Sequence, residues 1–516
     1  MYRDADFVSQ GPLPSNEASL VRDLELNTLL EAMACGDKFL FRVGKQALLS
    51  GLNESIETIL YRQSALNDCL NHDLEIRRIY ELAVEAIETK KTSWLGVFSR
   101  SPGGILYESL KLLQLFVGAL ERLKHLAEEN AGKFESEAFT VFFEMLKSEL
   151  SDEYLDSVKG HLKELRSRDD VLVSAELGAG NEIVNHTLRK FSDKEPRWYQ
   201  RVFARRVPAY TYRLAERDEA GARALSDLRD RGLNLVANAL AQSADHLLSF
   251  FVMLRTELAF YIGCANLHRR LTAAAAPICF PAPHPRGSGR HECAGLRDVG
   301  LLLTSGQTVV GNDLRADRKR LIIITGANQG GKSTFLRSLG VAQMMMHCGM
   351  FVLAESFNAE ICDGLFTHYK REEDAALESG KFDEELNRMS AIVDSLTANS
   401  IVLFNESFAA TNEREGSEIA RQIVRALMER GVRVIYVTHL IEFARSWWKR
   451  SSEEALFLRA ERQTDRQRTF KVIPGEPLQT SFGADLYDAI FGNASIGDSG
   501  GLKKPVASQC DKQVLV

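Results

Sequence analysis

The chain has 516 residues, more than one ordinary domain needs, and its 45% hydrophobic and 26% charged residues fit a globular protein rather than a disordered one. A net charge of -6 argues against a generally basic nucleic-acid coat but leaves a local basic face open. Eight cysteines without a CxxC pair indicate neither a disulfide framework nor a zinc ribbon, and they favour a reducing compartment.

The N-terminal stretch MYRDADFVSQ has no apolar core and so does not resemble a signal peptide. We expect residues 1–20 to be flexible. The most apolar run, LLSFFVML, is followed by Arg255 and Glu257 and is too short to span a bilayer. The sequence therefore predicts no membrane association and a cytoplasmic location, with association with the nucleoid left open.

Residues 21–275 predict an all-α domain. ESIETILYRQSALNDCLNHDLEIRRIYELAVEAIETK and ILYESLKLLQLFVGALERLKHLAEEN place apolar residues at helical spacing, with Pro102, Gly103 and Gly104 as breakers between them. Around DDVLVSAELGAGNEIV the pattern becomes strand-like, which predicts a small insert near 170–189 with a turn at Gly178 and Gly180.

Residues 218–271 predict one long helix, with a possible bend at Gly232. Six apolar residues fall on one stripe of it: Leu247, Phe251, Leu254, Leu258, Ile262 and Ala265. Such a stripe is usually the core of a helical bundle. A lever that couples the two ends of the protein is the alternative.

The stretch TAAAAPICFPAPHPRGSGRHEC is rich in Ala, Pro and Gly, and we place a linker and domain boundary at 276–305. His284, His291 and Cys293 lie within it. They lack a paired-ligand spacing, so the pattern favours loop residues over a metal site.

From 306 to 492, apolar strands alternate with amphipathic helices. RLIIITG, SIVLFNE and VRVIYVTH read as strands, and KSTFLRSLGVAQMMM and SEIARQIVRALMERG as helices. This alternation predicts a mostly parallel sheet between helices. The tail, 493–516, is rich in Gly, Ser and Lys and is expected to be disordered.

GANQGGKS, which starts at Gly326, fits the phosphate-loop pattern G-x-x-x-x-G-K-[ST] between a strand and a helix. Glycines let the backbone approach phosphate oxygens, and the helix N-terminus adds partial positive charge. Lys332 is expected to reach the β- and γ-phosphates of ATP, and Ser333 to ligate Mg²⁺. The predicted nucleotide-binding residues are Gly326, Ala327, Asn328, Gln329, Gly330, Gly331, Lys332, Ser333 and Thr334.

Polar residues follow two further strands. Asn405 and Glu406 end SIVLFNE, and His439 ends VRVIYVTH. Ligands of such sheets bind at the carboxyl ends of the strands, so Glu406 is expected to polarise the attacking water and His439 to sense the γ-phosphate. A surface carboxylate and a structural histidine are the alternatives.

These motifs resemble the ATPase core of the MutS mismatch-repair family, which belongs to the ABC-type ATPases. GMFVLAE and DGLFTH after the phosphate loop, VTH, and the late TSFGADLYDAIFG carry the resemblance over about 309–492. ILYRQSALND and the long helix show a weaker likeness to the family's core and lever domain. The resemblance implies an ABC-type P-loop ATPase domain preceded by an all-α core and lever domain.

The resemblance also implies a homodimer in which each subunit completes the other's ATP site. The signature segment is LESGKFDEELNRM, and Ser379 and Gly380 are its expected trans-acting residues. The family's serine-threonine-phenylalanine pattern is not intact here, and only Phe382 matches it.

The sequence departs from the family at the phosphate site. Asn405 stands where the family has an aspartate that holds a Mg²⁺-bound water, so weaker Mg²⁺ binding and slow hydrolysis are expected. Val309 is the nearest match to an aromatic residue that stacks on adenine, and Ala327 replaces a proline.

The family's mismatch-reading wedge is also missing, since the N-terminal stretch holds only DFVSQ, and the DNA clamp is reduced to the insert near 170–189. The candidate DNA-binding face is RWYQRVFARRVPAYTYR, where arginines alternate with aromatic residues; a solvated helix face is the plainer alternative. We therefore expect an ATP-dependent protein that binds DNA by shape, as part of mismatch repair or related DNA maintenance. The alternatives are a nucleotide-switched dimer acting on a protein or RNA and, less favoured, a metabolite kinase.

Overall fold

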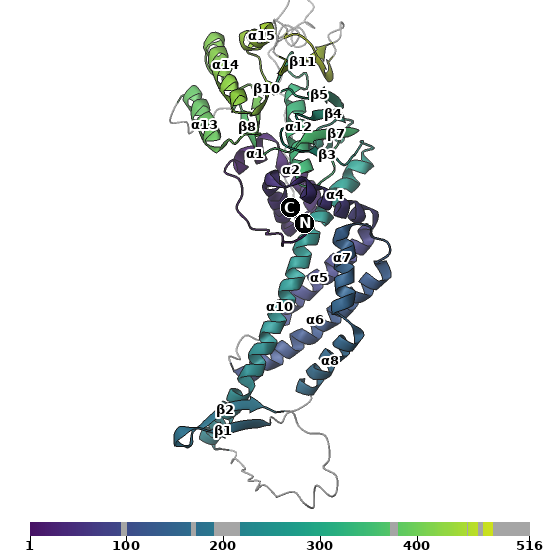
Figure 1. Cartoon of the computed structure of the whole chain (residues 1–516), viewed down its shortest axis with the longest axis vertical. Coiled ribbons are helices and arrows are strands. Elements are labelled where there is room, and N and C mark those ends of the chain that lie inside the picture. Colours follow the sequence, from purple (N-terminus) through teal and green to yellow (C-terminus); the bar gives the residue numbers. More distant parts are fainter. Residues whose placement is uncertain are drawn as a thin grey trace, which may run out of the picture.

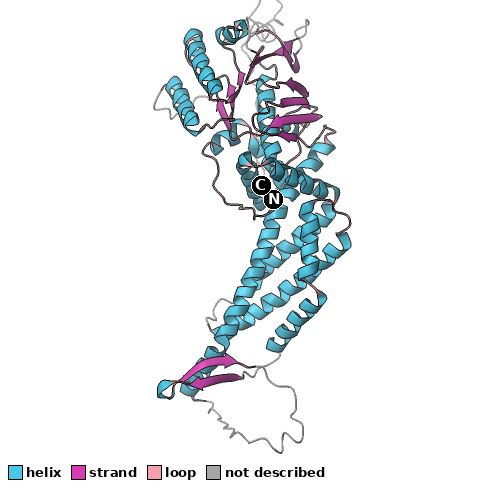
Figure 2. Ribbon diagram, viewed as in Figure 1, coloured by secondary structure: helices cyan, strands magenta, loops and turns pink. Residues whose placement is uncertain are grey.

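The computed structural model describes residues 1–93, 101–166, 172–189, 217–371, 380–450, 453–462 and 468–477. Figure 1 shows a long helical arm that joins an α/β head, and Figure 2 shows that most strands lie in the head. The segment 197–213, Ser379 and the tail 493–516 lie outside the described residues.

The arm and its junction with the head are built from helices. They are α1 (Glu17–Asp23), α2 (Leu26–Ala34), α3 (Lys38–Ser50), α4 (Ile56–Asn71), α5 (Asp73–Ser93), α6 (Pro102–Asn130), α7 (Glu137–Glu149), α8 (Asp152–Arg166) and α10 (Glu219–Ala273). Pro102, expected as a breaker, instead opens α6, where its missing N–H costs nothing.

The long helix α10 packs along α5 and α6 and is the spine of the arm (Figure 1). The predicted stripe is its core: Phe251, Leu258 and Ile262 are at most 4% exposed. By length and composition, α6 and α10 could each cross a membrane, but they pack against each other as bundle helices do.

A small hairpin lies at the far end of the arm, where the insert was predicted. Its strands β1 (Val173–Leu177) and β2 (Ile183–Leu188) pair antiparallel and contact α10 (Figure 1). Gly232 does not interrupt α10. A Cβ there would lie 2.5 Å from a methyl carbon of Val173, so this glycine makes room for β1.

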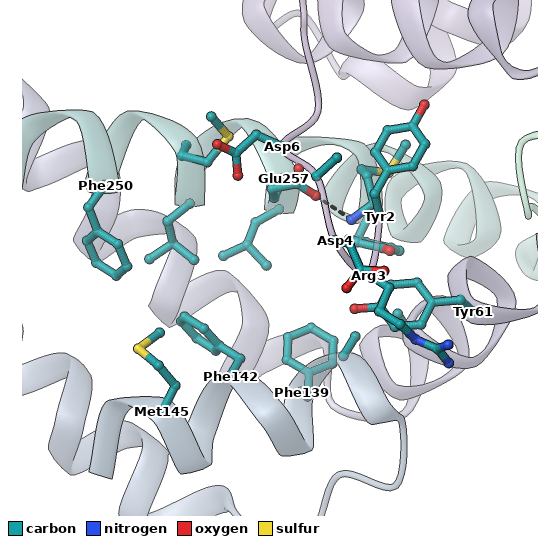
Figure 3. Close-up of a pocket in the computed structure, with 18 residues that line it drawn as sticks. Tyr2, Arg3, Asp4, Asp6, Tyr61, Phe139, Phe142, Met145, Phe250 and Glu257 are labelled. Carbon is teal, nitrogen blue, oxygen red and sulfur yellow. Dashed lines mark hydrogen bonds and ion pairs between the residues drawn. The ribbon is translucent and has the colours of Figure 1, made fainter. Parts of the chain in front are cut away.

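The N-terminal segment is packed, so our expectation of a flexible stretch at 1–20 is wrong. Phe7 is 3% exposed, its N–H donates to Glu257 at 2.7 Å, and Leu20 in α1 is fully buried. The segment also lines a cavity of about 490 Å³ beside α4, α7 and α10 (Figure 3). Buried apolar side chains and polar contacts such as the one to Glu257 together hold this short stretch on the bundle.

The main sheet of the head has the strand order β12-β11-β6-β10-β9-β8, and all neighbours pair parallel except β12, which is antiparallel to β11. This confirms the predicted α/β class. The strands are β6 (Leu321–Thr325), β8 (Leu365–Tyr369), β9 (Ile401–Asn405), β10 (Arg433–Val437), β11 (Ala455–Arg462) and β12 (Arg468–Pro474). The helices that follow strands of this sheet are α12 (Lys332–His347), α13 (Lys381–Ser395), α14 (Glu413–Glu429) and α15 (Ile441–Lys449).

The prediction of a linker at 276–305 is wrong, because this stretch forms regular secondary structure. It carries β3 (Ala282–His284), β4 (His291–Leu296) and α11 (Val299–Ser305). These strands form a second sheet, β3-β7-β4-β5, with β5 (Asn312–Arg315) and β7 (Ser356–Glu360). Pairing with strands far along the chain stabilises such short segments despite their Ala, Pro and Gly content.

His284, His291 and Cys293, which we expected in a loop, therefore lie in strands. His291 is buried in β4, and its Nδ1 accepts a hydrogen bond from Arg433 at 2.8 Å. Cys293 is buried in the same strand. Within the described ranges, no three His, Cys, Asp or Glu side chains are grouped as metal ligands.

An ion pair and a hydrogen bond join the head to the helices of the junction. Arg337, one turn into α12, donates to both carboxylate oxygens of the buried Asp298 at 2.7 and 2.9 Å, and it also pairs with Glu25. Thr367 in β8 donates to Asp23 of α1 at 2.7 Å. The helix that starts at the phosphate loop is thus tied directly to the arm's base.

Candidate functional site

The turn between β6 and α12 is a phosphate loop by geometry as well as by sequence. Gly331 adopts a left-handed conformation at φ 87° and is the N-cap of α12. A Cβ at Gly326 would lie 2.9 Å from the backbone nitrogen of Ala460, and one at Gly330 would lie 2.7 Å from the side chain of Ala460. Strand β11 therefore packs so closely on this loop that both positions require glycine.

Lys332 points back into the loop. It is 4% exposed, and its Nζ donates to the carbonyl oxygens of Gly326 at 3.0 Å and Ala327 at 2.9 Å. Burial lowers the pKa of Lys332 to about 8; Glu406 opposes this shift, and Arg468 adds to it. A buried ammonium whose hydrogen-bond partners are neutral carbonyls is well placed to receive an anion.

Ser333 and Asn405 face each other across the end of the sheet. The Ser333 hydroxyl donates to Oδ1 of Asn405 at 2.9 Å. Ser333 is exposed and Asn405 is partly exposed, so a ligand can reach both side chains. Hydroxyl and amide oxygens are hard donors that suit Mg²⁺, but neither carries a charge, so the pair fits the ion only when phosphates supply the negative charge.

Glu406 and His439 form the other half of the site. His439 Nε2 lies 2.9 Å from Glu406 Oε1, and both side chains are about one-third exposed or less. The contact with His439 is the main cause that lowers the pKa of Glu406, so this carboxyl is ionised at neutral pH. Glu406 has a left-handed φ of 54°, and its N–H donates to the carbonyl of Val437 at 2.8 Å.

Most of the predicted site residues converge because β6, β9 and β10 are neighbours in one parallel sheet. The phosphate loop, Gly326 to Thr334, follows β6. Asn405 ends β9, Glu406 comes directly after it, and His439 follows β10. Gly380 lies apart from these residues in the order of the sheet. It is the N-cap of α13, which follows the edge strand β8 (Figure 1).

The sequence did not predict two residues at this site, Arg468 and Phe470. Both lie on the antiparallel edge strand β12, which no motif marked. Arg468 donates to the phosphate-loop residue Gln329 at 2.6 Å. Phe470 is 49% exposed, and its carbonyl oxygen lies 3.2 Å from where a Gly331 Cβ would be. The sequence RTFKVIP gives no indication of this placement beyond an arginine and an aromatic residue. Val309, the expected stacking position, is only 7% exposed.

This fold and this site define an ABC-type P-loop ATPase domain. Residues 322–494 match the family model described as MutS domain V, which is an ATPase domain, and residues 54–274 match the MutS2 N-terminal domain. The chain is a MutS-family protein, and its helical half is of the MutS2 type.

Known proteins similar to this chain carry both family names. The DNA mismatch repair protein MutS of Thermotoga sp. (strain RQ2) is 36% identical over 137 residues, which are 26% of this chain and 17% of that protein. Endonuclease MutS2 of Thermus thermophilus is 33% identical over 132 residues, 25% of this chain and 18% of that protein. Endonuclease MutS2 of Lacticaseibacillus casei is 34% identical over 149 residues, 28% of this chain and 19% of that protein. The chain thus matches less than a fifth of the length of each of these relatives.

Proposed function

We propose that this protein binds and hydrolyses ATP as a homodimer and uses the ATP cycle to control its binding to DNA. The observation that carries the proposal is the convergence of Lys332, the Ser333–Asn405 pair and the Glu406–His439 pair at the ends of three neighbouring strands. An ATPase domain of MutS type supports ATP as the ligand.

The roles follow from the geometry. Lys332 would exchange its two carbonyl partners for phosphate oxygens, which form stronger charge-assisted hydrogen bonds. Ser333 and Asn405 would hold Mg²⁺, Asn405 through a water, and the ion would neutralise charge that develops on the phosphates. Ionised Glu406 would orient and polarise the attacking water, and His439 would keep Glu406 in place and contact the γ-phosphate.

Asn405 should limit Mg²⁺ binding. Because an amide oxygen lacks the charge of a carboxylate, Asn405→Asp should lower the Mg²⁺ concentration needed for half-maximal hydrolysis by about tenfold, the effect of one added charge at a partly exposed site. Titration of the ATPase rate with Mg²⁺ measures this, with Asn405→Ala as the control that should raise the concentration. An unchanged Mg²⁺ requirement in both variants would remove Asn405 from the ion site.

Phe470 is the proposed platform for the adenine ring, in place of the buried Val309. The backbone of Phe470 lies beside the phosphate loop and its side chain is 49% exposed, so the ring is accessible to a base. Stacking of a base on an aromatic ring is worth about 1–3 kcal/mol. Phe470→Ala should therefore weaken ATP binding about tenfold, while Phe470→Tyr keeps the affinity. Equal losses for ATP and for inorganic triphosphate would show that the ring does not contact the base.

ATP affinity should depend on pH through Lys332. In the free protein its pKa of about 8 means that the ammonium loses its proton as the pH rises through 8, whereas bound phosphates favour the charged form. Binding above pH 8 must then take up a proton, so the dissociation constant should rise about tenfold per pH unit. Titrations with a fluorescent ATP analogue from pH 7 to 9.5 test this. Lys332→Arg, which does not titrate there, should give a flat profile.

A homodimer through the ATPase domains would use the start of α13. Gly380 lies beyond the edge strand β8, away from its own phosphate loop in the sheet order, as a residue that serves the partner's site would. Ser379 precedes it in the chain and is assigned the same trans role. The N–H groups at the start of α13 would face the partner's γ-phosphate.

DNA is the proposed partner because the matched relatives include a DNA mismatch repair protein. Shape rather than a mismatch is the proposed target, with contacts from the far end of the arm and the arginine-rich segment 197–213. Fluorescence anisotropy with duplex, mismatched, branched and single-stranded DNA, each with ATP or ADP, tests this. Tighter binding of one form that changes with the nucleotide supports it; equal, weak binding of all forms opposes it.

The alternative partner is a protein or RNA, and the net charge of -6 favours it. In that case the nucleotide would still switch the dimer, while DNA would leave both binding and hydrolysis unchanged. A cytoplasmic location is proposed for either partner, and association with the nucleoid only for DNA.

A further inference from the structure

The loop after β9 holds Glu406 in an unfavourable backbone conformation. Both Glu406 and Phe408 have left-handed φ angles, 54° and 62°, which non-glycine residues rarely adopt. Such residues cost of order 1–3 kcal/mol each and persist only where their surroundings enforce them. The contacts that hold this loop therefore set the direction of the Glu406 side chain.

One of these contacts comes from α13. Oε2 of Glu385 accepts a hydrogen bond from the backbone N–H of Phe408 at 2.8 Å. Glu385 is 4% exposed, and Phe408 is fully buried. A buried N–H needs a partner, and here a helix supplies it through a side chain.

His368 of β8 adds a second link between the same parts. Burial lowers the pKa of His368 to about 4, so the ring is neutral at pH 7 and carries one N–H. Its Nε2 lies 3.0 Å from the carbonyl oxygen of Glu385, and its Nδ1 lies 2.8 Å from the hydroxyl of Ser407. With the proton on Nε2, the ring donates to the carbonyl oxygen of Glu385. The Ser407 hydroxyl beside Nδ1 also donates to the backbone carbonyl oxygen of His368, so Ser407 is held on β8. The ring also stacks on Phe408 at a centroid distance of 5.2 Å.

Strand β10 also holds the loop. Tyr436 donates to the carbonyl of Ser407 at 2.7 Å, and Glu406 donates to Val437. Glu385 and His368 therefore connect α13 to this loop by hydrogen bonds, and movement of α13 can reach Glu406 through them.

We propose that Glu385 is a positioning residue that couples the start of α13 to the orientation of Glu406. Glu385 lies five residues after Gly380, the N-cap of α13. When the start of α13 contacts the partner's nucleotide, the helix moves, Glu385 moves with the helix, and Glu406 is aligned for hydrolysis. Glu385 touches no reacting atom, and the inference rests on the proposed ATPase function and its trans-acting signature.

The test compares variants that keep or remove the acceptor atom. Glu385→Gln keeps an oxygen of the same reach, Glu385→Met has similar size but no acceptor, and Glu385→Asp withdraws the carboxylate by one methylene. Asp394→Met, which removes an exposed carboxylate from the same helix, is the matched control. The readouts are kcat, the dissociation constant for a fluorescent ATP analogue, and hydrogen–deuterium exchange of peptides that contain Phe408.

We expect Glu385→Met to lower kcat about 10- to 100-fold, as misplacement of a catalytic group by about 1 Å does. ATP affinity should stay within about twofold, because Glu385 touches no part of the phosphate loop, and exchange at Phe408 should speed up. Glu385→Gln should keep most of the activity, and Glu385→Asp should fall between. If Glu385→Met does not fold, the difference in kcat between Glu385→Gln and Glu385→Asp is the test of the proposal.

Two results would overturn the inference. One is a wild-type kcat in Glu385→Asp and, where it folds, in Glu385→Met. The other is a loss of kcat that comes with an equal loss of ATP affinity, which would show a general structural role. Failure of the ATPase proposal looks different: the wild type itself would then show no hydrolysis that Lys332→Ala removes.

Discussion

Glu406→Gln should hydrolyse ATP at least about 100-fold more slowly than the wild type, the range for loss of a group that acts on the attacking water. The glutamine has the same shape but no charge, so it can neither polarise the water nor accept its proton. ATP binding should change by less than about threefold, because Glu406 and the phosphates carry like charge and the loss of that repulsion offsets the loss of other contacts. Single-turnover hydrolysis and equilibrium binding of ATP measure the two quantities.

The same variant should reveal the dimer. If two ATPase domains close around ATP, blocked hydrolysis should trap that state, and sedimentation of Glu406→Gln should shift from monomer to dimer only with ATP.

His439→Ala is the companion variant, since it removes the 2.9 Å contact to Glu406 while the carboxylate remains. Hydrolysis by Glu406→Gln at the wild-type rate would contradict the assignment of Glu406.

Lys332→Ala should weaken ATP binding about 100-fold or more, the usual effect of removing one partner of a buried charge pair. The substitution should not destabilise the folded protein. Because burial lowers the pKa of Lys332, the ammonium destabilises the nucleotide-free protein, and its removal should leave the melting temperature unchanged or higher. Titration with ATP and thermal unfolding measure the two effects.

Lys332→Arg is the matched control, because it keeps the charge but cannot form the same two contacts with Gly326 and Ala327. It should bind ATP more weakly than the wild type and more tightly than Lys332→Ala. A variant without Lys332 that still binds ATP at wild-type affinity would show that the nucleotide binds elsewhere.

The sequence was most informative where local chemistry and pattern agree. The strand before Gly326 and the helix after Lys332 lie where the pattern predicted them, and so do the strands that end at Asn405 and precede His439. Parallel strands buried on both faces read as continuous apolar runs, and their carboxyl ends must meet. The roles assigned to these residues stay predictions until they are measured.

What the sequence did not reveal depends on contacts between distant segments. The strands within 276–305 are short and rich in Pro and Gly, and pairing with β5 and β7 is what makes them strands. Phe470 comes to the phosphate loop because β12 returns antiparallel beside β11. The bond from Glu385 to Phe408 joins residues that no periodicity relates. In each case tertiary contact outweighs local propensity.

The most direct measurement is steady-state ATP hydrolysis by the wild-type protein, alone and with duplex, mismatched, branched or single-stranded DNA, with Lys332→Ala as the control for contaminating activity. We expect slow hydrolysis that Lys332→Ala abolishes and that one form of DNA changes. Hydrolysis that no DNA affects would contradict the DNA role and favour a protein or RNA partner. No hydrolysis above the Lys332→Ala background would contradict the ATPase itself.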